Sequence, residues 1–171
     1  MRVRFDPALI PESPNLDFEL PLWQVGARLV AGLDEAGRGA LAGPVFAAAV
    51  ILPPEPERML QALAGARDSK QLSAKAREEL AGRIKKECAA WGLGWAEAEE
   101  IDRVGIARAG RMAFCRALQG LALEPEHLLL DYFRLPEMNL PQTALVKGDQ
   151  RSLSIACASI LAKTARDERM R

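Results

Sequence analysis

Two adjacent carboxylates, Asp34 and Glu35, stand directly before a glycine-rich turn that carries one cation, Gly37-Arg38-Gly39. Burying two neighbouring charges is costly unless a partner neutralises them, so a packed core does not explain this pair. Glycines let the backbone approach a ligand closely, and a guanidinium group binds phosphate. This combination of residue types is typical of a site that holds a divalent metal ion and a phosphate group.

Two further acids, Asp131 and Asp149, follow strands expected at residues 127–131 and 143–147. Ligand sites of open α/β sheets form at strand ends, so we expect all four carboxylates to converge there. Converging carboxylates repel one another unless a cation neutralises them, and oxygen ligands select a hard cation, Mg2+ or Mn2+. Two such ions about 4 Å apart can activate a water molecule and stabilise a leaving oxygen, which indicates phosphoryl chemistry.

Spacing alone leaves a second interpretation open, because a single acid at a strand end is usually a turn residue or a helix cap. A zinc site is disfavoured, since the chain has one histidine and no cysteine near these acids. The glycine cluster is not a dinucleotide-binding loop either. That loop opens directly into a helix, whereas Gly43-Pro44 leads into an apolar strand.

The elements that position these residues follow from hydrophobic periodicity and from chain breakers. Strands are expected at residues 28–34, 45–52, 91–97, 127–131 and 143–147, and helices at residues 58–64, 74–90, 105–121 and from residue 151 or 152 onward. The early strands are close in sequence and suit antiparallel pairing, while the later ones have helical spacers and suit parallel pairing. We therefore predict an α/β fold with a mixed five-stranded sheet flanked by helices.

Residues 1–27 are rich in proline, and we expect an extended arm that packs over a domain formed by residues 28–171. Its contacts are expected from Phe5, Phe18, Leu20, Leu22 and Trp23. Elsewhere, Glu99 and Glu100 are expected to begin an acidic turn, and Trp91 and Trp95 to pack in the core. The last helix is still in register at Arg171, so we expect that the helical C-terminal part is truncated and that more chain follows.

Composition narrows the function classes. The chain has 171 residues, and its 23 basic residues balance its 23 acidic ones, which argues against a strongly basic nucleic-acid coat but not against a local basic face. The 3 cysteines lack metal-site spacing and are expected to be reduced thiols, so we expect a cytoplasmic protein. The N-terminal residues lack a continuous apolar stretch and no apolar run approaches about 20 residues, so we expect neither a signal peptide nor a membrane-spanning helix.

Several motifs in one order go beyond spacing. The acid pair with its Gly-Arg-Gly turn is followed by Asp68-Ser69-Lys70, then by Leu129-Leu130-Asp131, by Lys147-Gly148-Asp149 and by a segment from Ala158 to Lys163 that leads to Arg166-Asp167. This set, which covers roughly residues 28–171, closely resembles ribonuclease HII. The resemblance implies a ribonuclease H-like fold.

The resemblance also implies an activity. Such an enzyme cuts the RNA strand of RNA/DNA hybrids and nicks DNA duplexes on the 5′ side of a single embedded ribonucleotide, leaving 3′-hydroxyl and 5′-phosphate ends. By motif, the metal-binding catalytic residues would be Asp34, Glu35, Asp131 and Asp149, with Mg2+ or Mn2+ as cofactor. The substrate-binding residues would be Gly37, Arg38 and Gly39, which sense the 2′-hydroxyl, and Lys70, Ser159 and Lys163, which contact phosphates. We expect a monomer that does not bind membranes.

Some alternatives remain at this point. Asp167 competes with Asp149 as the fourth ligand, but we expect it to pair with a nearby arginine, because it lies well into the last helix. The junction-stacking tyrosine of the family has no counterpart here, since the single tyrosine, Tyr132, directly follows Asp131. A ribonuclease HIII is disfavoured because it would need a large N-terminal domain. Another two-metal nuclease of the same fold, or a non-catalytic binding module, is disfavoured because neither would need the Gly-Arg-Gly turn together with all four acids.

Overall fold

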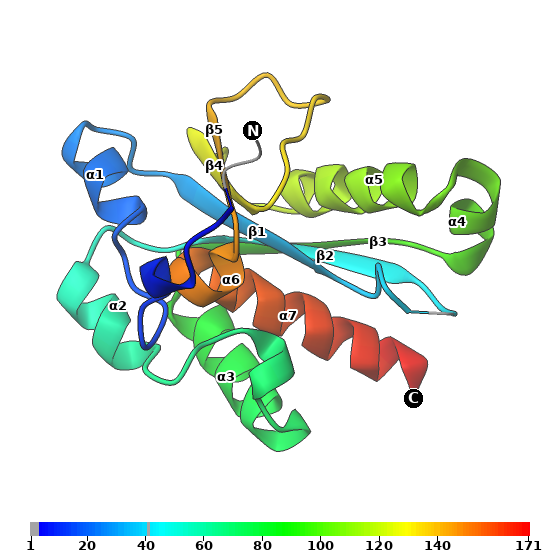
Figure 1. Cartoon of the computed structure of the whole chain (residues 1–171), viewed down its shortest axis with the longest axis horizontal. Helices are drawn as coiled ribbons and strands as arrows, with labels where there is room; N and C mark the ends of the chain where they lie inside the picture. The colour runs from blue at the N-terminus through cyan, green and yellow to red at the C-terminus, as the bar shows by residue number, and fades with distance from the viewer. Residues whose placement is uncertain (1–3, 41) are drawn as a thin grey trace.

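The computed structural model describes residues 4–40 and 42–171, and it has one five-stranded sheet with helices on both faces (Figure 1). The strands are β1 (Val30–Ala36), β2 (Val45–Ile51), β3 (Ala90–Ala96), β4 (His127–Asp131) and β5 (Gln142–Leu145). The helices are α1 (Glu19–Gln24), α2 (Pro56–Ala62), α3 (Ala74–Glu87), α4 (Ala98–Val104), α5 (Ile106–Gln119), α6 (Gly148–Arg151) and α7 (Leu153–Met170), with 3-10 turns η1 (Pro7–Leu9) and η2 (Ser69–Gln71).

The sheet is mixed, as predicted, and its strand order is β3-β2-β1-β4-β5. The first three strands pair antiparallel, while β4 pairs parallel with β1 and with β5. Strand β1 therefore occupies the centre of the sheet and ends at the acid pair. Because β1 and β4 are parallel neighbours, their C-terminal ends meet at one edge of the sheet, which is where the predicted acids stand.

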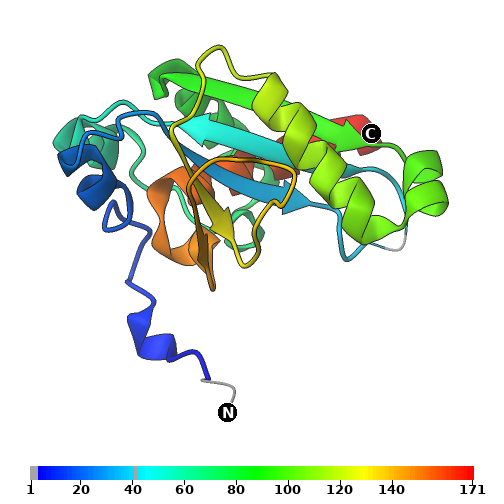
Figure 2. The same ribbon diagram turned by 90° about the horizontal axis from the view of Figure 1, so that it is seen from above.

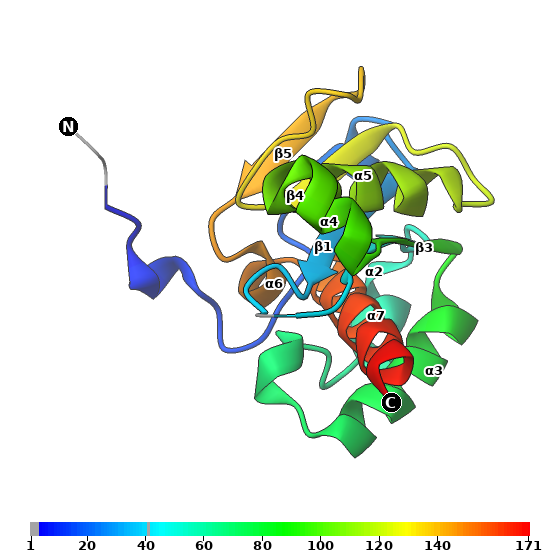
Figure 3. The same cartoon turned by 90° about the vertical axis from the view of Figure 1, so that its right-hand side faces the viewer.

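Each face of the sheet has its own apolar core. Helix α5 packs against β2 and β3 on one face, whereas α7, with α3 beside it, packs against β1 and β2 on the other (Figures 1 and 3). Side chains of successive strand residues point to opposite faces. In β1, Ala31 and Leu33 thus join the α5 core, while Gly32 faces α7. By the same alternation Asp34 faces the α7 side and Glu35 the α5 side.

The prediction that Trp91 and Trp95 pack in the core is wrong. Both lie on the face of the edge strand β3 that is turned away from α5, where they are 37% and 44% exposed. The buried face of β3 carries Gly92 and Gly94 instead, because a Cβ atom at either glycine would overlap the backbone of α5. The tryptophans lie on the opposite face of β3, where Trp95 stacks on Phe46 with the ring centroids 5.6 Å apart.

Two local predictions also differ from the structure. Residues 98–104 form helix α4 rather than an acidic turn, because Glu97 and Glu100 make a capping box that satisfies the backbone donors at the helix start. The N-terminal arm is not extended throughout. It contains η1 and α1, and its first part projects from the body in Figure 2. Its side chains Leu16, Phe18, Leu20, Leu22 and Trp23 pack on the apolar cores, as expected for all of them but Leu16.

The buried carboxylate of Glu19 joins this arm to α7. Its Oε1 atom accepts hydrogen bonds from the hydroxyls of Ser152 and Ser154, at 2.6 Å each, and from the backbone N–H of Ser154 at 3.0 Å. Ser152 in turn caps α7 by accepting from the Ile155 N–H at 3.3 Å. Burial raises the pKa of Glu19, and these hydrogen bonds offset only part of that effect. The arm therefore holds the start of α7, the helix that runs beneath the acid-bearing strand.

Replacing Glu19 by glutamine tests this contact through its pH dependence. Because the pKa of Glu19 is higher in the folded state, its contribution to stability is fully present below its ordinary value of 4.5 and declines as pH rises through the folded value. Glutamine keeps the size and one acceptor oxygen without the charge. We expect the Tm of the variant minus that of the wild type to increase with pH. The corresponding change in the free energy of unfolding is about 1.4 kcal/mol for each unit by which the pKa of Glu19 differs between the folded and unfolded states.

Thermal unfolding followed by circular dichroism between pH 4 and 8 measures this difference. Glu12→Gln is the control, because Glu12 is an exposed carboxylate of the same arm. A Tm difference for Glu19→Gln that does not change with pH would contradict the expectation.

Candidate active site

A hollow of about 380 Å³ opens at the C-terminal ends of β1 and β4, and we call it the acid hollow. Every residue that the sequence assigned to a site lines it: Asp34, Glu35, Gly37, Arg38, Gly39, Lys70, Asp131, Asp149, Ser159 and Lys163. These residues come from five separate segments of the chain: the end of β1 with the turn after it, η2, β4, α6 and α7. The structure thus brings all of them together, while the chemical role of each stays a prediction.

The sheet itself places Asp34 and Glu35, which lie in β1, and Asp131, which lies in β4. In the parallel pair of β1 and β4, Leu33 lies opposite Leu130, so Asp34 and Asp131 come next at the same sheet edge. Both point to the α7 side, and Asp34 is buried. Its Oδ1 atom accepts from the backbone N–H of Glu35 at 2.8 Å, which orients the carboxylate at the strand end.

Asp149 reaches the hollow by a different route from the one predicted. It does not stand directly after a strand but lies in the one-turn helix α6, which follows β5. Lys147 makes the turn between them with a left-handed backbone (φ 57°), an uncommon conformation for a residue other than glycine. The N–H of Gly148 then donates to Asp131 Oδ1 at 2.7 Å, so this turn and the end of β4 are tied together.

The acids raise one another's pKa. Burial raises the pKa of Asp34 well above its usual range, and the charges of Glu35, Asp131 and Asp149 add to the effect. Burial and the Asp131 carboxylate raise the pKa of Asp149 to about 7. Burial also raises the pKa of Glu35, against the opposing charge of Arg38, whose guanidinium lies 3.6 Å away. This concentration of negative charge would be relieved by a bound cation.

The donor set suits a divalent cation, because it consists of carboxylate oxygens around a small polar hollow. As the side chains are arranged, however, no three acidic, histidine or cysteine residues in the described part of the chain are grouped closely enough to hold a metal ion. The acid hollow therefore has the charge of a metal site without a closed set of ligands. Metal binding would need the carboxylates to move inward and would compete with protons on Asp34 and Asp149.

The Gly-Arg-Gly turn is held against α7 by Arg166. This side chain donates to the carbonyl oxygens of Pro44 and Ala42 at 3.0 Å each, which ties the loop after β1 to the last helix. Gly37 has a φ of 99°, and a Cβ atom there would also collide with Arg166. A glycine is therefore required at residue 37, and the loop backbone faces the hollow without side chains between.

Apart from Arg38, the basic and hydroxyl side chains of the hollow come from η2 and α7. Ser159 of α7 donates to the Ser69 hydroxyl at 3.0 Å and accepts from its N–H at 3.3 Å, so the turn η2 is fastened to α7. Asp68 starts η2 and accepts from the N–H of Lys70 at 3.0 Å. These contacts fix the backbone from which the Lys70 ammonium extends toward the hollow.

Asp167 does not line the acid hollow. Its carboxylate pairs with Arg77 at 2.9 Å and with Lys163 at 2.6 Å, and these contacts lower its pKa. The expected pairing with a nearby arginine is thus confirmed. Because Lys163 lines the hollow, Asp167 acts here as the anchor of a basic side chain.

Two polar lining residues were missing from the sequence-based set, Ser69 and Arg166. Both stand inside motifs already singled out, and Arg166 follows Lys163 by three residues, which puts them on one helix face. That spacing was the available signal. Tyr132 lies outside the hollow, is 74% exposed and has a left-handed backbone (φ 74°). His127 forms a hydrogen bond with the Thr143 hydroxyl at 2.8 Å, between β4 and β5.

Comparison with known proteins identifies the family to which this chain belongs. The family model described as ribonuclease HII matches residues 31–171, the part of the chain that contains every residue of the acid hollow. The chain belongs to the ribonuclease HII family. Ribonuclease HII enzymes are endoribonucleases of the ribonuclease H type, and the mixed sheet with flanking helices is the ribonuclease H-like fold.

The relatives are similar over most of this chain. Ribonuclease HII of Moorella thermoacetica is 54% identical over 153 residues, which are 90% of this chain and 72% of the relative. Ribonuclease HII of Myxococcus xanthus is 51% identical over 91% of this chain, which spans only 52% of that protein. The crystal structure of ribonuclease H2 from Pyrococcus horikoshii superposes with a TM-score of 0.71 at 27% identity, covering 82% of this chain and 73% of that one.

Proposed function

We propose that this protein is a metal-dependent endonuclease that hydrolyses the RNA strand of RNA/DNA hybrids and nicks duplex DNA on the 5′ side of a single ribonucleotide. The observation that carries the proposal is the convergence of four acids, the Gly-Arg-Gly turn and the side chains of Lys70, Ser159 and Lys163 on one hollow. The acids alone would fit several nucleases. Their combination with an exposed glycine backbone and Arg38 favours an enzyme that inspects a sugar.

The ribonuclease HII-type substrate is recognised by its 2′-hydroxyl, which distinguishes a ribonucleotide from its DNA neighbours. We assign this role to Gly37, Arg38 and Gly39, because all three line the hollow beside Asp34 and nothing lies within 4 Å of a Cβ atom built at Gly39. Lys70, Ser159 and Lys163 would hold phosphates on the other side of the hollow. Contacts of this kind position a duplex without reading its sequence.

Asp34, Glu35, Asp131 and Asp149 would hold Mg2+ or Mn2+, which carboxylate oxygens favour. When bound, a pair of such ions supplies an activated water and stabilises the leaving oxygen, a reaction that leaves 3′-hydroxyl and 5′-phosphate ends. The chain's own part is to keep the carboxylates converged and to hold the flanking phosphates. Arg38 adds a positive charge beside Glu35.

The remaining features of the proposal concern the setting. We assign catalysis to residues 28–171 and treat residues 1–27 as an arm that supports α7. The protein would act as a monomer in the cytoplasm, where its free cysteines stay reduced. Among the described helices, none is both long and apolar enough to cross a membrane.

A cleavage assay tests the proposal directly. A fluorescently labelled DNA duplex with one internal ribonucleotide should be nicked once, on the 5′ side of that nucleotide, in the presence of Mg2+ or Mn2+. A matched all-DNA duplex should stay intact, and EDTA should stop the reaction. Cleavage of both duplexes would point to another nuclease of the same fold, and absence of cleavage with either metal would overturn the proposed activity.

A further inference from the structure

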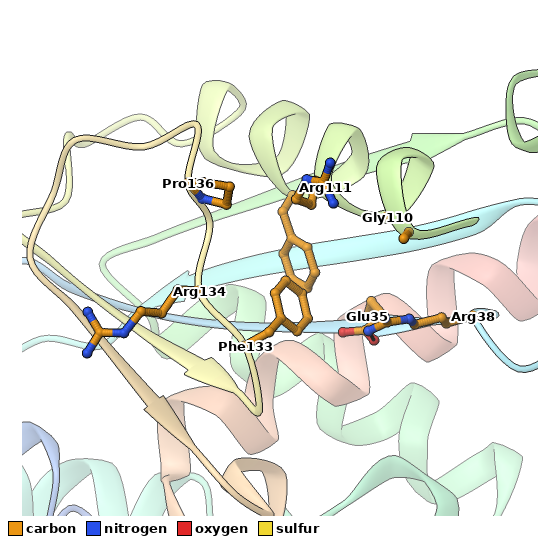
Figure 4. A pocket seen from close by; sticks show the side chains of 9 residues that line it. Glu35, Arg38, Gly110, Arg111, Phe133, Arg134 and Pro136 are labelled. Atoms are coloured by element: carbon orange, nitrogen blue, oxygen red, sulfur yellow. Dashed lines mark ion pairs between the residues drawn. The ribbon is translucent and has the colours of Figure 1, made fainter. Parts of the chain in front are cut away.

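A second hollow, of about 290 Å³, lies on the α5 face of the sheet, and we call it the α5 hollow (Figure 4). It shares Glu35 and Arg38 with the acid hollow. Its floor is formed by Ala107 and Gly110 of α5, and Phe133 forms one wall. Nothing in the proposed catalytic chemistry uses it.

The strand pleat makes the two hollows neighbours. Asp34 faces the α7 side and belongs to the acid hollow alone, while Glu35 faces the α5 side and borders both. The ion pair between Glu35 and Arg38, at 3.6 Å, therefore stands on the boundary. A polynucleotide whose sugar rests against the Gly-Arg-Gly turn would place an adjacent nucleotide next to the α5 hollow.

The chemistry of the lining fits such a nucleotide. Arg38, Arg111 and Arg134 outnumber the single lining carboxylate, Glu35, although Arg111 is also paired with Glu137 at 2.6 Å. Arg134 has no ion-pair partner among the residues described, and in Figure 4 it extends away from Glu35 and Arg38 on the outer side of Phe133. Cations beside an aromatic face are the combination with which proteins bind strands of nucleic acid.

The Phe133 ring, which forms the aromatic wall, is held in place by its neighbours. Phe133 meets Phe114 edge to face with the centroids 5.3 Å apart, which fixes its ring plane. The Arg38 guanidinium lies 5.4 Å from the centre of the Phe133 ring. Opposite, Gly110 leaves the floor open, since a Cβ atom built there would meet nothing within 4 Å.

We propose that the α5 hollow seats a nucleotide of the substrate duplex that neighbours the cleaved linkage, with its sugar or base against Phe133 and its flanking phosphates held by the surrounding arginines. This inference rests on the proposed function, because it extends the substrate path from the acid hollow across the Glu35–Arg38 pair. It makes the α5 face a part of the binding surface.

Gly110 provides the test. Gly110→Leu fills the hollow, whereas Gly110→Ala, the matched control, makes the same change of backbone freedom and adds only a methyl group. We expect Gly110→Leu to raise the Kd for the ribonucleotide-containing duplex by roughly tenfold, measured by fluorescence anisotropy in EDTA, and to raise KM similarly with kcat near wild type. Gly110→Ala should bind nearly as wild type does.

A second variant keeps the test decisive if leucine at residue 110 prevents folding. Phe133→Leu retains an apolar side chain but removes the ring face, and it should weaken binding in the same direction. Arg134→Gln should reduce the slope of log Kd against log salt by about one, because one phosphate contact is lost. Thermal unfolding of each variant shows whether it is folded.

The outcomes separate the two proposals. Wild-type Kd and KM for folded Gly110→Leu and Phe133→Leu, alongside normal cleavage by the wild type, would overturn the α5 hollow and leave the proposed function standing. If the wild type cuts neither the RNA/DNA hybrid nor the ribonucleotide-containing duplex, the proposed function fails. The Kd values of the variants and the wild type then decide by themselves whether the α5 hollow binds nucleic acid.

Discussion

Asp149→Asn is expected to slow cleavage roughly a thousandfold or more, whereas Asp167→Asn should keep most of the rate. Asp149 is a buried carboxylate of the acid hollow, so its replacement removes charge from the group that would hold the metal. Metal-ion catalysis supplies several kcal/mol of transition-state stabilisation, and each 1.4 kcal/mol is a factor of ten. Asp167 only anchors Lys163 and Arg77.

Single-turnover kinetics on the ribonucleotide-containing duplex measure this contrast. The metal-induced increase in Tm provides a readout that does not depend on activity, and it should disappear in Asp149→Asn but persist in Asp167→Asn. Asp167→Asn should instead weaken duplex binding modestly, because Lys163 loses its partner. Loss of the metal-dependent Tm increase in Asp167→Asn, with retention in Asp149→Asn, would reverse our assignment of the fourth ligand.

Gly32→Ala should be strongly destabilising, by roughly 3 kcal/mol or more. A Cβ atom at Gly32 would lie 2.5 Å from the backbone nitrogen of Ile155 and closer still to the carbonyl carbon of Ser154. Because these are main-chain atoms of α7, they cannot rotate away as a side chain would. The helix would have to move off the central strand, and with it the start of α7 that Glu19 holds.

Urea unfolding monitored by tryptophan fluorescence gives the free energy of unfolding. Gly82→Ala is the matched control, since Gly82 lies in the middle of α3 and a Cβ atom there meets nothing within 4 Å. That variant should gain roughly 1 kcal/mol from helix propensity. Equal stability of Gly32→Ala and wild type would mean that α7 is free to shift from β1.

The sequence was most informative where residue type alone restricts chemistry or backbone. Asp34, Glu35 and Asp131 are polar residues at the ends of apolar strands, and the parallel pairing of β1 with β4 brings strand ends to one edge whatever the side chains between them. Hydrophobic periodicity likewise located the strands and the long helices, because burial on one face imposes its period on the chain.

Local predictions failed where distant segments decide the outcome. The positions of Trp91 and Trp95 depend on how closely α5 approaches β3, and only Gly92 and Gly94 permit that approach. Asp149 lies in α6 because the left-handed turn at Lys147 and the hydrogen bond to Asp131 favour a helical turn over a continued strand.

The sequence by itself therefore determined the fold class, the family motifs and ten of the residues that line the acid hollow. Only the tertiary structure decided that Glu19 of the arm holds α7, that Asp167 anchors Lys163, and that an arginine-lined aromatic hollow adjoins Glu35. The physical reason is that motif residues reveal themselves by type and order along the chain. The hydrogen bonds of Glu19, the ion pair of Asp167 with Arg77 and the α5 hollow exist only through contacts between segments far apart in sequence, and no short pattern encodes these contacts.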